Sequence, residues 1–147
     1  MKMIELTEAE SKVMKEAKNQ VFLGGTCNDS SWRETLKPML TIGYFDPVVP
    51  DWNEEAYKLE LIAREHSKFC LYVLTPKMTG VYSIAEVVDD SNKRPEKTVF
   101  CFLEKDGDLE FDKHQLKSLV NTGKMIKANG GTVLNSLEEV AEFLNKA

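Results

Sequence analysis

The sequence predicts an α/β fold in which a five-stranded parallel sheet lies between two layers of helices. The runs FCLYVL, at 69–74, and TVFCFL, at 98–103, are apolar almost throughout, which is typical of central parallel strands covered on both faces. Along the chain, runs of this kind alternate with segments whose apolar residues recur at helical spacing. This alternation predicts βαβ units, in which helices connect parallel strands.

In the first half of the chain, caps, glycines and prolines mark the ends of the elements. Thr7 and Glu10 form a capping-box pattern, which opens a helix over 7–18 as an N-terminal extension. The apolar run at 21–25 ends in two glycines and is the first predicted strand. The elements expected after it are a helix of about two turns from Trp32, a strand at 42–45, a loop broken by Pro47 and Pro50, and a helix around 56–63.

The second half of the chain continues the alternation and completes the sheet. The elements expected are a strand at 69–74, a loop at 75–82, a helix from Ser83, a solvated charged loop at 89–97, a strand at 98–103, a helix at 116–128, a strand at 132–134 and a last helix opened by a capping box at Ser136 and Glu139. Five strands at this spacing suit the flavodoxin-like order 2-1-3-4-5, with residues 1–147 as a single domain. Ligands of such sheets bind at the carboxyl ends of strands 1 and 3, so the loops after the first three strands are the expected site.

Composition narrows the class of partner. A formal net charge of -5 and a pI of about 5.2 argue against nucleic acid as the main partner. The N-terminus is charged and no apolar run reaches the length needed to span a bilayer, so neither a signal peptide nor a membrane partner is expected. Three widely spaced cysteines favour a reducing cytoplasm. The two histidines are isolated, so no metal site is expected, and subunit number stays open, a homo-oligomer included.

The loop after the first strand allows two different chemistries. Cys27 and Arg33 have the C-x5-R spacing of a thiolate phosphatase. A phosphatase loop needs backbone N–H groups that converge on the phosphate, usually with glycine inside the loop. None of the five intervening residues is glycine, and Asp29 would place a carboxylate beside the phosphate. These features favour the other interpretation, in which the segment is a loop of a ligand pocket and the Cys27 thiol has no role.

Glu86, at the start of the helix after the third strand, is the main catalytic candidate. Ser83 and Glu86 fit a capping box, in which the glutamate only bonds back to the Ser83 N–H. Alternatively, the helix N-terminus favours the ionised carboxylate, which is what covalent glycosyl transfer needs as a nucleophile. The sequence alone leaves both roles open.

Three motifs in this order resemble the nucleoside 2-deoxyribosyltransferase-like family. They are GG…WR after the first strand, Asp46-Pro47 after the second and TPKMTGVYSIAE after the third, and together they cover roughly residues 21–103. The resemblance implies that Glu86 attacks the anomeric carbon of a nucleoside. It also implies that the first two loops form the pocket for sugar and base, through Gly25, Thr26, Asn28, Trp32 and Asp46.

Two positions depart from the pattern of that family. The family commonly has E-x-G at the catalytic helix, where this chain has Glu86-Val87-Val88. It also often has an aspartate at the start of strand 3, thought to assist the leaving base, where this chain has Lys68. The general acid is therefore unassigned.

The function expected is an N-glycoside transferase or hydrolase that acts on a nucleoside or nucleotide and needs no metal or organic cofactor. A binding module that holds a nucleotide-derived ligand without turnover is the alternative, and the phosphatase is the third hypothesis. Trp32 and Trp52 either contact the ligand or pack within the protein. Met78 and Tyr82 either pack on a base or close the loop after the third strand. Besides Glu86, the predicted site residues are Gly24, Gly25, Thr26, Asn28, Trp32, Asp46, Trp52, Met78 and Thr79.

Overall fold

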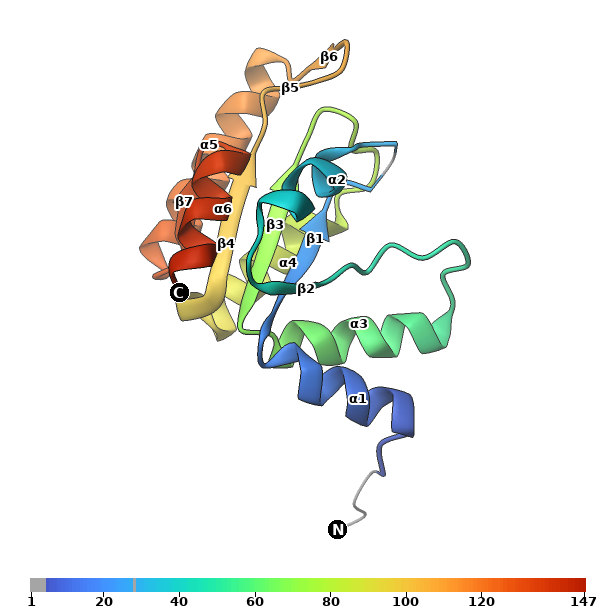
Figure 1. Cartoon of the computed structure of the whole chain (residues 1–147). Helices are drawn as coiled ribbons and strands as arrows, with labels where there is room; N and C mark the ends of the chain where they lie inside the picture. The colour runs from blue at the N-terminus through green and yellow to red at the C-terminus, as the bar shows by residue number, and fades with distance from the viewer. Residues whose placement is uncertain (1–4, 28) are drawn as a thin grey trace.

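A five-stranded parallel sheet forms the centre of the computed structural model, which describes residues 5–27 and 29–147 (Figure 1). The strand order is β2-β1-β3-β4-β7, which confirms the predicted flavodoxin-like order because β7 is the fifth strand of this sheet. The strands are β1 (Gln20–Gly25), β2 (Gly43–Phe45), β3 (Phe69–Leu74), β4 (Thr98–Phe102) and β7 (Thr132–Leu134).

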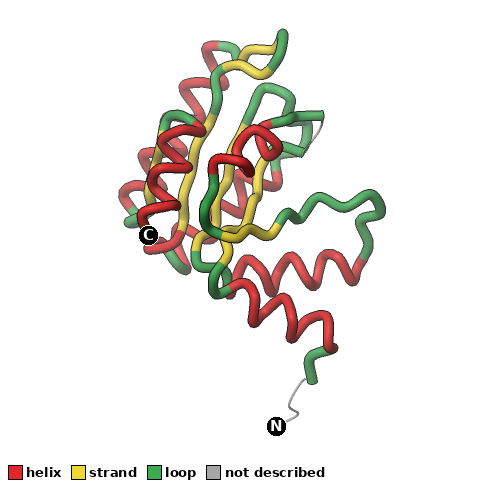
Figure 2. The backbone as a smooth tube through the Cα atoms, in the orientation of Figure 1, coloured by secondary structure: helices red, strands yellow, loops and turns green. Residues whose placement is uncertain are grey.

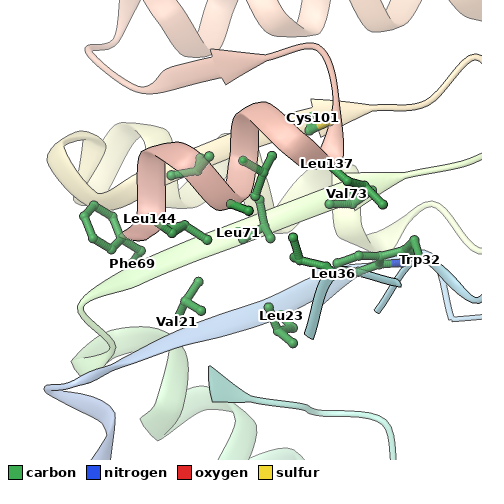
Figure 3. Packing of buried hydrophobic residues seen from close by; sticks show 13 residues of the cluster. Val21, Leu23, Trp32, Leu36, Phe69, Leu71, Val73, Cys101, Leu137 and Leu144 are labelled. Carbon is green, nitrogen blue, oxygen red and sulfur yellow. The ribbon is translucent and has the colours of Figure 1, made fainter. Parts of the chain in front are cut away.

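Helices cover both faces of the sheet, as Figure 2 shows by colour. The α-helices are α1 (Glu8–Ala17), α2 (Trp32–Leu36), α3 (Glu54–His66), α4 (Tyr82–Lys93), α5 (Lys113–Ala128) and α6 (Leu137–Lys146), with short 3-10 helices η1 (Lys37–Met39) and η2 (Pro95–Lys97). Helices α2 and α6 pack on one face, where side chains such as Leu23, Leu36, Leu71 and Leu144 form a buried cluster (Figure 3). On the other face, α3, α4 and α5 pack on a second cluster that contains Phe22, Tyr72 and Phe100.

Side-chain caps explain where several helices begin. Thr7 and Glu10 form the predicted capping box of α1, and Asn53 caps α3. Helix α5 begins earlier than predicted because Asp112 and Gln115 form a second capping box. At α6, Ser136 accepts from the Glu139 N–H as predicted, but the Glu139 carboxylate accepts from the Asn135 N–H instead of closing the box.

Two segments differ from the prediction. Residues 89–97 are not a solvated loop: they contain the last turn of α4 and η2, and Asp90 is fully buried. A run of charges ordinarily favours solvent, but here the buried Asp90 is paired with Arg94 of the same segment and with Arg64 of α3. A small hairpin of β5 (Lys105–Asp106) and β6 (Leu109–Glu110) follows β4, and two-residue strands are too short to leave a periodic pattern.

Candidate active site

A pocket of about 660 Å³ opens at the carboxyl ends of β1 and β3. This is the position expected for a ligand in a doubly wound sheet, since β1 lies between β2 and β3 and the chain changes direction there. The loops after β1, β2 and β3 line the pocket together with one face of α3 and the start of α4. Of the predicted site residues, the structure brings together at this pocket Gly24, Gly25, Thr26, Trp52, Met78, Thr79 and Glu86.

Two predicted site residues, Trp32 and Asp46, do not line the pocket, and a third cannot be placed relative to it. Trp32 is buried in the core, and its indole Nε1–H donates to the Thr26 carbonyl at 2.7 Å. Asp46 Oδ2 accepts from Lys37 Nζ at 2.7 Å, and Asp46 Oδ1 lies 3.7 Å from Arg33 Nε. These contacts hold the start of the loop after β2 against the segment that follows β1. Asn28 lies outside the described residues.

The loop after β1 is held against β3 by backbone contacts that require glycine. Gly25 has a φ of +118°, and a Cβ there would meet the Val73 carbonyl oxygen at 2.0 Å. The Thr26 N–H donates to that carbonyl at 2.9 Å, and Thr26 Oγ1 accepts from the Thr75 N–H at 2.9 Å. This close approach fixes the floor of the pocket and explains the glycines of the GG motif.

Arg33 is a structural clamp, which argues against the phosphatase hypothesis. Its three guanidinium nitrogens donate to the backbone carbonyls of Leu23, Thr26 and Gly25, at 3.0, 2.7 and 3.4 Å. The residue is 5% exposed, and burial lowers its pKa, although Asp46 opposes this effect. A guanidinium with three backbone partners is not available to bind a phosphate. The arginine of the C-x5-R pattern therefore stabilises the loop after β1.

Glu86 lies in the second turn of α4 and is 7% exposed at the pocket wall. The predicted capping box is wrong, because Val81 is the N-cap of α4 and Ser83 is already inside the helix. The carboxylate Oε2 instead lies 3.5 Å from Arg64 Nη1. Burial raises the pKa of Glu86 to about 7, against the effect of Arg64 and with the help of Glu60 and Asp90.

Arg64 belongs to a buried ionic network that the sequence did not reveal. Its Nη2 lies 2.8 Å from Asp90 Oδ1, and Arg94 Nη2 lies 2.7 Å from the same oxygen. The Tyr72 hydroxyl donates to the other Asp90 oxygen. Burial opposes ionisation of Asp90, but these hydrogen bonds outweigh it and lower its pKa. The network therefore holds Arg64, and through it Glu86, in one place.

Sequence reasoning missed two side chains of the pocket, Tyr57 and Glu60. Tyr82, which is expected beside Met78 to pack on a base or close the loop, and Ser83, the expected cap partner of Glu86, also line the pocket. Tyr57 and Glu60 lie one turn apart on α3, with Arg64 one turn further on, so a polar stripe on this predicted helix was the available signal. The Trp52 ring packs edge-on against Tyr57, with 5.6 Å between ring centroids. A side-chain hydrogen bond joins Tyr57 and Tyr82 and raises the pKa of Tyr82.

The two departures from the family pattern also have clear positions. Val88 packs against the core cluster on the α4 side of the sheet and is not among the residues described at the pocket wall, so it does not narrow the pocket. Lys68 precedes β3, and its N–H donates to the carbonyls of Ala17 and Gln20 at the amino end of the sheet. The side chain at position 68 therefore starts from the end of β3 opposite to the pocket.

Among residues 5–27 and 29–147, no three His, Cys, Asp or Glu side chains come together in a way that could hold a metal ion. Nor does any helix described there have the length and apolar character needed to cross a membrane.

The comparisons with known proteins give one match. A family model described as "Nucleoside 2-deoxyribosyltransferase like" matches residues 18–105. This span contains β1 to β4, α3, α4 and the described pocket residues. No match was found among curated proteins, and none among solved structures. Since the matched span is more than half of the chain, the protein belongs to the nucleoside 2-deoxyribosyltransferase-like family.

Proposed function

We propose that this protein is an N-glycoside transferase or hydrolase acting on a nucleoside or nucleotide, with Glu86 as the nucleophile. The observation that carries the proposal is the position of Glu86: it is buried in the pocket wall, at the carboxyl ends of β1 and β3, beside a fixed arginine. An oriented carboxylate at the bottom of a ligand-sized pocket is the group required for covalent glycosyl transfer.

The proposed reaction has two displacement steps at the anomeric carbon. A Glu86 oxygen attacks C1′ as the C1′–N bond breaks, and the bonding electron pair leaves with the base. The glycosyl–enzyme ester is then attacked by a second base or by water, and the Glu86 carboxylate is restored. Metal and organic cofactors have no part in these steps.

The pocket lining supports a nucleoside as the ligand. Small-molecule sites typically enclose roughly 300–1,000 Å³, and this pocket of about 660 Å³ falls within that range. Trp52, Tyr57 and Tyr82 supply aromatic surface on which a nucleobase can stack. Gly24 and Gly25 line the pocket without side chains, so a ligand there meets main-chain atoms of β1.

A binding module without turnover is the second candidate function. It is favoured by the pKa of Glu86, which burial raises to about 7. At neutral pH part of the population then carries a protonated carboxyl, which can donate a hydrogen bond to a ligand but is a poor nucleophile.

Turnover by a matched pair of variants tests the two functions. The assay is base release or base exchange, followed by chromatography, on a panel of nucleosides and nucleotides with the wild type, Glu86→Gln and Glu65→Gln. Glu65 is on α3 with an exposed side chain and serves as the carboxylate control. We expect Glu86→Gln to fold, bind ligand and lose turnover by several powers of ten, while Glu65→Gln behaves like the wild type.

Two results would decide against the mechanism. Normal turnover in a folded Glu86→Gln protein would remove Glu86 as the nucleophile. A wild type that is inert on the whole panel, yet is stabilised by one of its members in a melting experiment, would establish the binding module instead.

The setting of the reaction is part of the proposal. We place the protein in the cytoplasm because Cys27, Cys70 and Cys101 are all unpaired, as expected in a reducing compartment. The net charge of -5 supports a small molecule rather than a nucleic acid as the partner.

A further inference from the structure

Helix α3 brings a second carboxylate to the pocket that contains Glu86. Glu60 lies three residues after Tyr57 and four before Arg64, so these three side chains share one face of α3. Tyr57 and Glu60 line the pocket directly, and Arg64 reaches Glu86 from the same face. The two carboxylates therefore flank one ligand space from two different helices.

The contacts of Glu60 differ from those of Glu86. Its Oε2 accepts a hydrogen bond from Trp52 Nε1 at 3.4 Å, which ties it to the loop after β2. In the part of the chain that the structure describes, its carboxylate has no ion pair within 4.0 Å, whereas Glu86 has Arg64. Two carboxyl groups at one pocket, one paired with a cation and one not, can take different roles in a displacement at C1′.

We propose that Glu60 is the general acid–base of the reaction, protonating the base that leaves and deprotonating the acceptor that arrives. The inference rests on the proposed function of Glu86. In the first step, a Glu86 oxygen forms a bond to C1′, the C1′–N bond breaks, and the Glu60 proton moves to the departing base. In the second step, water or a second base attacks C1′, its proton moves to Glu60, and the bond from C1′ to Glu86 breaks.

Burial and neighbouring charges act on both carboxyl groups. Burial raises the pKa of Glu60, while the Trp52 hydrogen bond and the charges of Arg64 and Arg33 act against that shift. The other titratable groups at its pocket face are Cys27, Tyr57, Tyr82 and Glu86. The charge of Glu60 also helps to raise the pKa of Glu86. Ionisation of one carboxyl group therefore disfavours ionisation of the other, and a proton on either one relieves their repulsion.

The substrate decides where that proton lies during the reaction. Positive charge develops at C1′ in the transition state, next to Glu86, and it favours the ionised form of that residue. The departing base gains electron density and takes the proton from Glu60. Glu60 is thereby left ionised and ready to accept the proton of the acceptor.

Nucleosides with leaving groups of different quality provide the test. The substrates are 2′-deoxyguanosine, thymidine and 5-fluoro-2′-deoxyuridine, beside 7-methyl-2′-deoxyguanosine, whose base already carries a positive charge and departs without protonation. The proteins are the wild type, Glu60→Gln, Glu86→Gln and the control Glu65→Gln, each checked by a melting curve. Gln at position 60 retains an oxygen that can accept from Trp52.

We expect Glu60→Gln to lose about 10²–10⁴-fold in kcat/KM on the substrates that need an acid, the usual contribution of general acid–base catalysis. It should lose less than about tenfold on the 7-methyl substrate, and the alkaline limb of its pH profile should disappear. Glu86→Gln should lose activity on every substrate. This contrast separates proton transfer from a structural role, which would slow all substrates alike.

Three results would overturn the proposal. Equal losses on all substrates would make Glu60 a structural residue, and unchanged rates would remove it from the reaction, while both leave Glu86 as the nucleophile. A wild type inert on every substrate would reject the proposed function together with this inference. The reverse pattern, with Glu86→Gln active on the 7-methyl substrate and Glu60→Gln inactive, would exchange the two roles.

Discussion

The Nη1 atom of Arg64 lies 3.5 Å from Oε2 of Glu86, and both side chains are buried between α3 and α4. Arg64 also binds Asp90, which α4 places four residues after Glu86 on the same face. One arginine thus compensates two buried carboxylates. Its position links the stability of the fold to the ionisation of the candidate nucleophile.

Removing the arginine should therefore destabilise the protein strongly. In Arg64→Met, Asp90 retains Arg94 and Tyr72, but Glu86 is left in a buried site without a cation. Loss of one partner of a buried pair costs about 3–5 kcal/mol, which urea denaturation measures. The exposed pair of Lys58 and Glu54 on the same helix is the control, and Lys58→Met should cost less than about 1 kcal/mol.

A double variant identifies the pair responsible. If Glu86 causes part of the loss, then Arg64→Met combined with Glu86→Gln should be less destabilised than the sum of the single changes. Strict additivity would show that Arg64 stabilises the fold without Glu86, through its ion pairs with Asp89 and Asp90.

The pH dependence of stability gives a test of Glu86 that needs no substrate. Its pKa is about 7 in the folded state, against 4.5 as the ordinary value. Between these values the folded protein binds more protons than the unfolded chain, so this group lowers stability as pH rises from about 4.5 to 7. Glu86→Gln removes the effect and should raise the free energy of unfolding by about 1–3 kcal/mol at pH 8 relative to wild type.

The difference in the free energy of unfolding between Glu86→Gln and wild type should shrink towards zero as pH falls to about 4.5, because below that pH the Glu86 carboxyl is protonated in both the folded and the unfolded state. Denaturation curves of both proteins at pH 5, 6, 7 and 8 provide the comparison. A capping glutamate would behave differently, because its replacement destabilises the helix. A constant difference across this range would mean that Glu86 titrates normally.

Most of the sheet could be predicted from the sequence because each strand is short, apolar and bounded by a turn or a cap. The run at 69–74 is buried at every position, as its composition indicates. The loops of the site were also predictable, since the carboxyl ends of β1 and β3 are set by strand order. The position of Gly25 followed from the same reasoning, and its positive φ supplies the physical reason.

The ionic network could not be predicted, because Arg64 is far in the sequence from the carboxylates that it binds. Asp90 and Arg94 belong to a charged stretch that resembles a solvated loop, and only the packing of α3 brings Arg64 to it. Glu60 was missed for a different reason: a glutamate at helical spacing ordinarily faces solvent, but here it accepts a hydrogen bond from Trp52. The sequence pattern predicts Trp32 and Asp46 as site residues because it places them in site loops, but it says nothing of the direction of their side chains, and neither lines the pocket.

Gly25 should tolerate no side chain. In Gly25→Ala the Cβ would meet the Val73 carbonyl oxygen at 2.0 Å, and the φ of +118° is strained for an L-residue. Relief requires the loop to move away from β3, which should cost more than about 2 kcal/mol and reduce ligand affinity. Gly80→Ala is the matched control, since its Cβ would have no heavy atom within 4 Å apart from its chain neighbours.

The measurements are thermal unfolding and ligand-induced stabilisation of both glycine variants. Gly80→Ala should melt close to the wild type. If Gly25→Ala also melts at a temperature close to that of the wild type, the contact between the GG loop and β3 is not required for stability.

Cys27 should be dispensable. It is an exposed thiol at the pocket edge, and the arginine of its C-x5-R pattern donates to backbone carbonyls. Cys27→Ser should keep N-glycosidic activity within a few-fold of wild type. Release of phosphate from phosphate esters by the wild type, abolished in Cys27→Ser, would restore the phosphatase hypothesis.

The charges at the pocket predict a preference for nucleosides over their 5′-monophosphates. Among the described residues that line the pocket, the charged side chains are Glu60, Glu86 and Arg33. All three nitrogens of Arg33 donate to backbone carbonyls, so a phosphate would meet two carboxyl groups and an arginine already committed to the protein. Like charges in a partly enclosed site repel one another, and each factor of ten in affinity corresponds to about 1.4 kcal/mol.

Titration calorimetry with Glu86→Gln, which should bind without turnover, measures this preference. We expect the nucleoside to bind at least tenfold more tightly than its 5′-monophosphate at low salt, with the gap narrowing as salt screens the repulsion. Tighter binding of the monophosphate would point to the N–H groups at the start of α4, near Ser83, as a phosphate site that outweighs the carboxylates. Because Glu60 retains its charge in this variant, Glu60→Gln added to Glu86→Gln should reduce the discrimination further, which ties the preference to the pocket carboxylates themselves.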